Sequence, residues 1–114
     1  MDAMMKAQFA VFQEDFEVIS NKWHIDGNPE LPFHLNPDGT CKINTGTISH
    51  GKYIYNAYRG LLMVSFNRYN NVQDFFMELY GDGADDVVTY EVLRFEKGHA
   101  LELRGESGRT YYLR

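Results

Sequence analysis

The sequence predicts a mainly-β fold, an antiparallel sandwich or barrel of about eight short strands that follows one amphipathic helix. Three observations lead to this prediction. Apolar residues recur at helical spacing up to residue 19 and then alternate with polar residues. Turn-forming residues interrupt the alternating part about every eight to twelve residues, which is typical of sandwiches and barrels. Aromatic residues make up 15% of the chain, and sheets favour them.

Residues 2–19 are predicted to form the helix. Five apolar residues lie three or four positions apart and therefore share one helical face: Met5, Phe9, Phe12, Phe16 and Ile19. Neither Gly nor Pro interrupts the segment, and Asp2 can cap its N-terminus. Exposure of this stripe would leave a large apolar patch, so we expect it to pack on the chain's own sheet. The alternative is a helix that binds a partner.

From Trp23 onward the apolar residues alternate with polar ones, as in half-buried strands. The Asn36–Gly39 turn joins two of these strands into a hairpin, because Pro37 suits its first corner and Gly39 its end. Residues 44–51 are polar and loop-like, with room for a short strand. The expected strands span residues 23–25, 31–35, 41–43, 53–58, 61–66, 75–80, 88–92, 101–104 and 111–113.

The whole chain, 1–114, is expected to be one domain made of the helix (2–19) and the strands (22–114). A chain of 114 residues is long enough to bury one hydrophobic core. No long helical segment separates the predicted strands, which argues against βαβ units.

The charge balance limits the classes of partner. The net charge is −5, from 11 basic and 16 acidic residues, so we expect no nucleic-acid or membrane partner. The one cysteine, Cys41, cannot form an intrachain disulfide. The N-terminal residues lack the basic start and apolar run of a signal peptide, so the cytoplasm is the expected compartment. We expect a monomer or a homodimer.

No residue pattern indicates a catalytic or metal site, and no cofactor is expected. The four histidines come from different predicted strands or loops, and no two lie at metal-ligand spacing. They are His24, His34, His50 and His99. The acidic loop Gly81–Asp86 lacks the twelve-residue spacing and closing Glu of a calcium loop, so a solvated turn is expected.

Five short segments match one group of small barrels. They are Trp23 on the first strand, Leu35–Thr40, Tyr90–Val92, Leu101–Leu103 and Thr110–Arg114. On these segments the chain resembles the small lipocalin-like domains of bacteria, in the calycin group of up-and-down β-barrels. The usual glycine before the tryptophan is Asn21 here, and the usual phenylalanine before the turn is displaced to Phe33.

The resemblance implies an antiparallel up-and-down barrel of about eight strands. In such barrels Trp23 would seal one end, and Arg114 would lie across its ring. The resemblance also implies a non-enzymatic domain that binds a small apolar or aromatic molecule.

The supply of aromatic residues agrees with a binding cavity, since an eight-stranded barrel has room for side chains or one small ligand. The alternative, which the sequence favours, is that half of these rings lie outside the barrel in cross-strand pairs. The residues predicted to line this cavity are Tyr55, Phe66, Phe75, Met77 and Tyr90. Two other readings stay open. One is a protein–protein interaction module that uses the helix or a sheet edge. The other is an α+β enzyme whose helix lies on a curved sheet.

Overall fold

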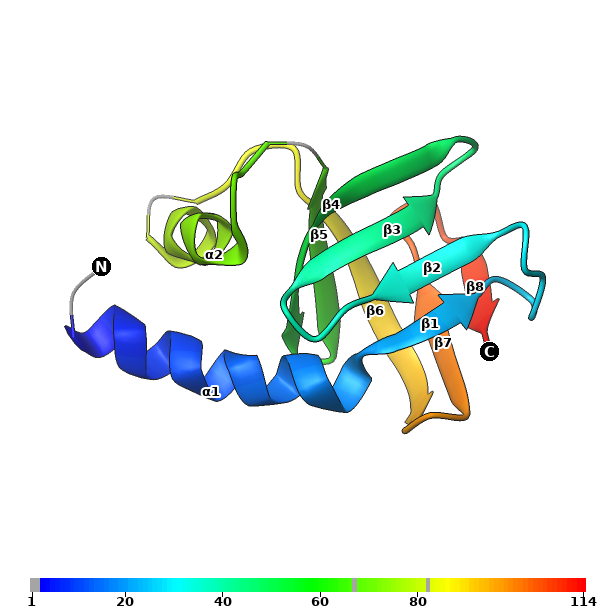
Figure 1. The fold of residues 1–114 in the computed structure, drawn as a ribbon, viewed down its shortest axis with the longest axis horizontal. Helices are drawn as coiled ribbons and strands as arrows, with labels where there is room; N and C mark the ends of the chain where they lie inside the picture. Colours follow the sequence, from blue (N-terminus) through cyan, green and yellow to red (C-terminus); the bar gives the residue numbers. More distant parts are fainter. Residues whose placement is uncertain (1–2, 67, 82) are drawn as a thin grey trace.

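The computed structural model describes residues 3–66, 68–81 and 83–114, and the side chains at 5, 6, 8 and 11–14 lie outside the description. Its eight strands form one antiparallel sheet in which each strand pairs with its neighbour in sequence (Figure 1). The strands are β1 (Asn21–His24), β2 (Pro32–Leu35), β3 (Thr40–Asn44), β4 (Ile48–Asn56), β5 (Leu61–Phe66), β6 (Val88–Glu96), β7 (Ala100–Arg104) and β8 (Thr110–Leu113). The helices are α1 (Ala3–Ile19) and α2 (Val72–Tyr80).

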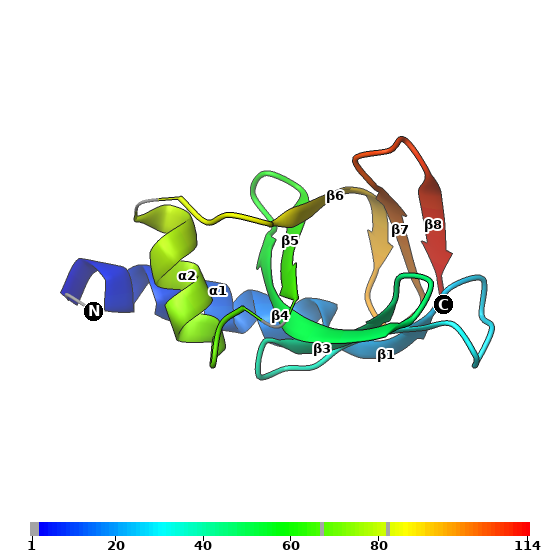
Figure 2. The ribbon, with the colours of Figure 1, turned by 90° about the horizontal axis from the view of Figure 1, so that it is seen from above.

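The sheet curls until its first and last strands meet (Figure 2). Three backbone hydrogen bonds join them: His24 and Arg114 exchange a pair at 2.9 and 3.1 Å, and the Asp26 N–H donates to Tyr112 at 2.7 Å. A bridge between Ile25 and Leu113 lies at the same place. The result is a nearly closed eight-stranded up-and-down barrel, which confirms the predicted fold class and is compatible with a calycin-like fold.

Alternation along the strands puts one set of side chains inside the barrel. Trp23 is paired with Phe33 across two strands, and Phe33 is paired with Ile43. Tyr53 and Val64, which pair with each other, continue this inward-pointing set on β4 and β5. Because neighbouring residues in register point to the same side of a sheet, this set forms a single core. Each of the five is no more than 1% exposed.

Helix α1 confirms the helix expected at the N-terminus and closes one end of the barrel. Phe9, Phe16 and Ile19 are buried, whereas the side chains of Met5 and Phe12 lie outside the described part. The indole N–H of Trp23 donates to the Ile19 carbonyl at 3.0 Å, so the fully buried ring is bonded to the last turn of the helix.

Residues 75–80, expected as a strand, belong to helix α2 instead. The Asn71 side chain accepts from the Asp74 N–H at 2.8 Å and so caps the helix N-terminus. The buried residues Val72, Phe75 and Phe76 share one face, which packs beside α1 through a Phe9–Phe76 ring contact of 5.3 Å. Both helices contact β4. The alternating pattern was therefore a misleading signal within a short apolar run.

Strand β4 begins at Ile48, inside residues 44–51, which were predicted to be a loop with room for a short strand. The second half of that segment is therefore part of β4. Gly51 lies in it where the chain approaches β5 closely, because a Cβ there would collide with the Ser65 carbonyl. Farther along β4, Ile54 points outward and is fully buried under the helices, so both faces of this strand are covered.

The expected contact between Arg114 and Trp23 is wrong. Leu113 points into the barrel against Ile25, so Arg114, the next residue along the strand, points out and is exposed. Among the described residues, the cation–π contact is that of Arg109 with Tyr111.

Cys41 is buried on an inward position, and burial raises the pKa of its thiol to about 12. Neither described helix has the length and apolar character needed to cross a bilayer.

Candidate ligand-binding site

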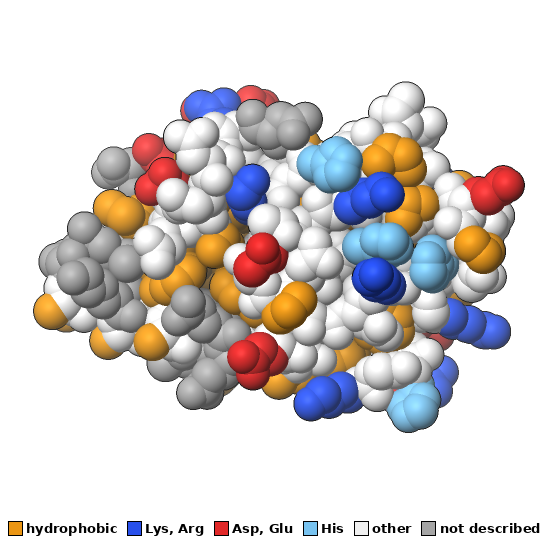
Figure 3. Space-filling view, in the orientation of Figure 1, with side chains coloured by type: hydrophobic (Ala, Val, Ile, Leu, Met, Phe, Trp, Pro, Cys, Tyr) orange, Lys and Arg blue, Asp and Glu red, His pale blue; other side chains and the backbone are white. Residues whose placement is uncertain are grey.

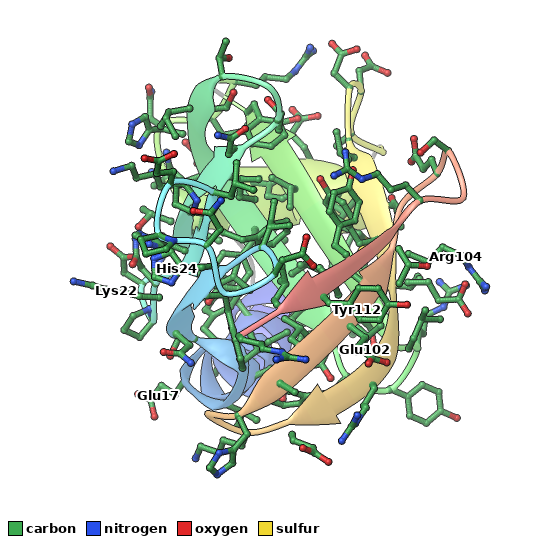
Figure 4. The ribbon with its side chains drawn as sticks, turned by 90° about the vertical axis from the view of Figure 1, so that its right-hand side faces the viewer. Glu17, Lys22, His24, Glu102, Arg104 and Tyr112 are labelled. Atoms are coloured by element: carbon green, nitrogen blue, oxygen red, sulfur yellow. The ribbon has the colours of Figure 1, made fainter. Side chains whose placement is uncertain are left out.

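A cavity of about 610 Å³ occupies the end of the barrel opposite α1. Figure 4 looks onto this end, where the β1–β2, β3–β4 and β7–β8 connections surround the opening. The cavity is lined by Ile25, Leu31, Phe33, Ile43, Asn44, Thr45, Gly46, Phe66, Val88, Tyr90, Arg109 and Tyr111. The lining is thus apolar inside and polar at the β3–β4 turn and at Arg109.

Aromatic rings form one wall of the cavity. Tyr90 makes edge-to-face contacts with Phe33 and with Tyr111, at centroid distances of 5.6 and 5.8 Å. Such geometry is the favoured arrangement for aromatic pairs and holds each ring in a defined orientation. The three rings come from β2, β6 and β8, none of which pairs with another of the three, so the curling of the sheet brings them together.

Tyr90 and Arg109 are polar or charged residues of the lining. Tyr90 is 5% exposed, and burial raises the pKa of its phenol to about 12, so the hydroxyl stays protonated at neutral pH. The Arg109 guanidinium lies 4.7 Å from the centroid of the Tyr111 ring and forms no ion pair with any residue that the structure describes. It can therefore meet an acceptor or anionic group of a ligand at the opening.

The structure brings two of the five predicted site residues into this cavity, Phe66 and Tyr90. Tyr55 points inward but lies near the end that α1 closes, where its ring meets Phe95 at 6.2 Å. There burial, and then the charge of Asp15, raises the pKa of its phenol.

The other two predicted site residues, Phe75 and Met77, lie on α2 outside the barrel. Phe75 is fully buried and Met77 is 37% exposed. Their place in the predicted cavity followed from the strand assigned to this segment, which the structure shows as helix α2.

Phe33, Ile43 and Arg109 line the cavity although the sequence analysis did not single them out as site residues. The signal for Phe33 and Ile43 was their alternation with polar neighbours at the β2–β3 hairpin, which put them on the inner face. Arg109 carried no such signal, because it lies in the turn before β8 and its position depends on how that turn folds.

The described acidic residues of the Gly81–Asp86 loop form ion pairs with an arginine of the same chain. Asp85 and Asp86 lie 3.8 and 3.1 Å from the Arg68 guanidinium, whereas Asp82 lies outside the described part. Within the described ranges, no cluster of three or more His, Cys, Asp or Glu side chains could hold a metal ion.

The described residues form an eight-stranded antiparallel barrel that α1 closes at one end and that has a cavity at the other. Its strand order and closure are those that the lipocalin-like resemblance implies. No family model, curated protein or solved structure matches the chain, so membership of the lipocalin-like group stays a prediction.

Proposed function

We propose that this chain is a lipocalin-like binding domain that takes up a small apolar or aromatic molecule at the open end of the barrel. The observation that carries the proposal is the 610 Å³ cavity, whose volume lies within the range of about 300–1,000 Å³ for small-molecule sites. Its lining follows the usual plan of such sites, with apolar walls and a few polar groups that orient the ligand.

The ligand's apolar body lies against Phe33, Ile43 and Tyr90. Its polar end faces the opening, where Arg109 supplies a charge and the Tyr90 hydroxyl supplies a neutral hydrogen-bond donor. A molecule with one apolar part and one acceptor or anionic group fits this arrangement.

Among the described residues, part of the surface on which an interaction module would depend is covered, although Met4 and Val18 of α1 are exposed. Phe16 and Ile19 of α1 are at most 1% exposed, and β1 and β8 bond to each other where an open barrel would have edges. These observations favour the cavity over the helix or a sheet edge as the site of action.

An environment-sensitive dye with an aromatic body and a sulfonate, such as anilinonaphthalene sulfonate, tests the proposal. We expect the folded protein to bind one dye per chain and to raise its fluorescence. Val88→Trp places a large ring into the cavity lining, and we expect it to weaken binding about tenfold or more, or about 1.4 kcal/mol.

Leu93→Trp is the matched control, because it adds the same ring to the same strand at a side chain that is 42% exposed and outside the cavity. The dye should bind this variant as it binds the parent chain. Equal affinity in parent and Val88→Trp, or equal loss in both variants, would refute a site in the cavity.

A further inference from the structure

Two histidines that lie ten residues apart in the chain contact each other on the outer face of the barrel. His24 on β1 and His34 on β2 are both half-buried, and their Nε2 atoms lie 3.3 Å apart. The ring centroids are 5.2 Å apart and the ring planes are nearly perpendicular, at 89°. Register explains the meeting, because Lys22 pairs with His34 and His24 lies two residues farther along β1, on the same face.

The two Nε2 atoms lie within hydrogen-bond distance of each other, and the same distances match those of two ligands on one tetrahedral ion. Two Zn–N bonds of about 2.0–2.1 Å that meet at a tetrahedral angle hold their nitrogens about 3.3–3.4 Å apart. Imidazole rings that point at a shared ion in this way have centroids about 5.2 Å apart. The nitrogen separation and the centroid separation of the His24–His34 pair therefore both fit without movement of the backbone.

We propose that His24 and His34 form a two-histidine site for a divalent transition-metal ion, Zn²⁺ above all, on the outer face of β1 and β2. The site is separate from the cavity, which lies inside the barrel. Imidazole nitrogen is a preferred ligand of Zn²⁺, and the two remaining tetrahedral positions are open to water or to a small anion.

The surroundings of the pair are cationic. Lys22 and Lys42 lie directly opposite His34 on the two neighbouring strands, and Lys42 lies opposite His50. Figure 3 shows histidine and basic side chains gathered on this face. The lysines oppose a bare dication, but they attract an anion to its open positions, and their flexible stems let the ammonium groups turn to solvent. Figure 4 shows Lys22 extending away from the barrel near His24.

Calorimetric titration of the untagged chain with ZnCl₂ at pH 7.5 tests the site. We expect one ion per chain with a dissociation constant at or below about 100 µM. His24→Ala and His34→Ala should each weaken binding about tenfold or more. His50→Ala and His99→Ala are matched controls, since both side chains are exposed and lie outside the pair, and they should bind as the parent does.

A second measurement uses the unaltered chain and so does not depend on how a variant folds. In NMR spectra, Zn²⁺ should shift the ring C–H signals of His24 and His34 and leave those of His50 and His99 in place. A proton shared between the two rings would also hold these nitrogens together. No saturable binding, equal shifts of all four histidines, or full retention of binding in His24→Ala and His34→Ala would overturn the metal site.

Discussion

The bond between Trp23 and α1 gives a sharp test of how the barrel end is closed. Trp23→Phe keeps an aromatic ring at a fully buried position but removes the indole N–H, which donates to the Ile19 carbonyl at 3.0 Å. A buried carbonyl left without its donor costs about 1–3 kcal/mol. The smaller ring also leaves a gap, which costs about 1 kcal/mol more. We therefore expect a loss of about 2–4 kcal/mol of unfolding free energy.

Urea unfolding followed by far-UV circular dichroism measures this loss, since the variant has no tryptophan to report by fluorescence. With a urea dependence of about 2 kcal/mol per molar, the midpoint should fall by about 1–2 M. Trp23→Ala should cost about 3–5 kcal/mol, because it also removes the ring.

Tyr58→Phe is the matched control, because this side chain is fully exposed and its change should stay within about 0.5 kcal/mol. If Trp23→Phe costs no more than this control, the indole bond does not hold α1 on the barrel and the reasoning is refuted.

Two further predictions follow from the strands. Gly51→Ala should destabilise the fold by about 1–3 kcal/mol in the same urea assay, because its Cβ collides with the Ser65 carbonyl. Gly105→Ala is the control, since its Cβ meets only ordinary contacts at 3.4 Å and beyond. Similar unfolding midpoints for the two variants would contradict this prediction. The pKa of His34 is lowered on folding from its usual 6.5, so the unfolded chain binds more protons and stability should fall as the pH drops below about 6.5. His34→Gln should flatten this part of the stability profile when measured with a chelator present, and an unchanged slope would remove His34 as its cause.

The elements that the sequence predicts well are those that a strong local pattern defines. The stripe that includes Phe9, Phe16 and Ile19 has no competing period, and α1 follows it. The Asn36–Gly39 turn joins β2 and β3 as expected, with φ at +88° for Gly39, a conformation that glycine adopts freely.

Helix α2 shows where local pattern fails. Its run of apolar residues from Phe75 fits both an alternating strand and one helical face, and length alone does not separate the two. The better signal was Asn71, three residues before Asp74, because this spacing suits a helix N-cap. Packing against Phe9, far away in the sequence, then adds stability that no local window contains.

The candidate site was harder to predict than the fold because it depends on register. Phe66 and Tyr90 were assigned to a cavity and line one, while Tyr55, on the same inward parity, lies toward the opposite end. Alternation along a strand predicts whether a side chain points into the barrel or out of it. The position of that side chain along the barrel axis depends on how the strands pair, which the local sequence does not specify. The same reason hid the His24–His34 pair, whose spacing along the chain matches no metal motif.

The closure between β1 and β8 bears on how the proposed ligand would enter the cavity. Every other strand pair joins neighbours in sequence, whereas this one joins the two ends of the meander through three backbone hydrogen bonds. Short, solvent-facing pairings open more often than a protein's core. Ile25 on one side of this seam and Tyr111 on the other both line the cavity. We therefore expect transient parting of the seam to widen the opening from the side while α1 and the β4–β5 pair stay folded, with faster amide exchange at His24, Asp26 and Arg114 as its earliest sign.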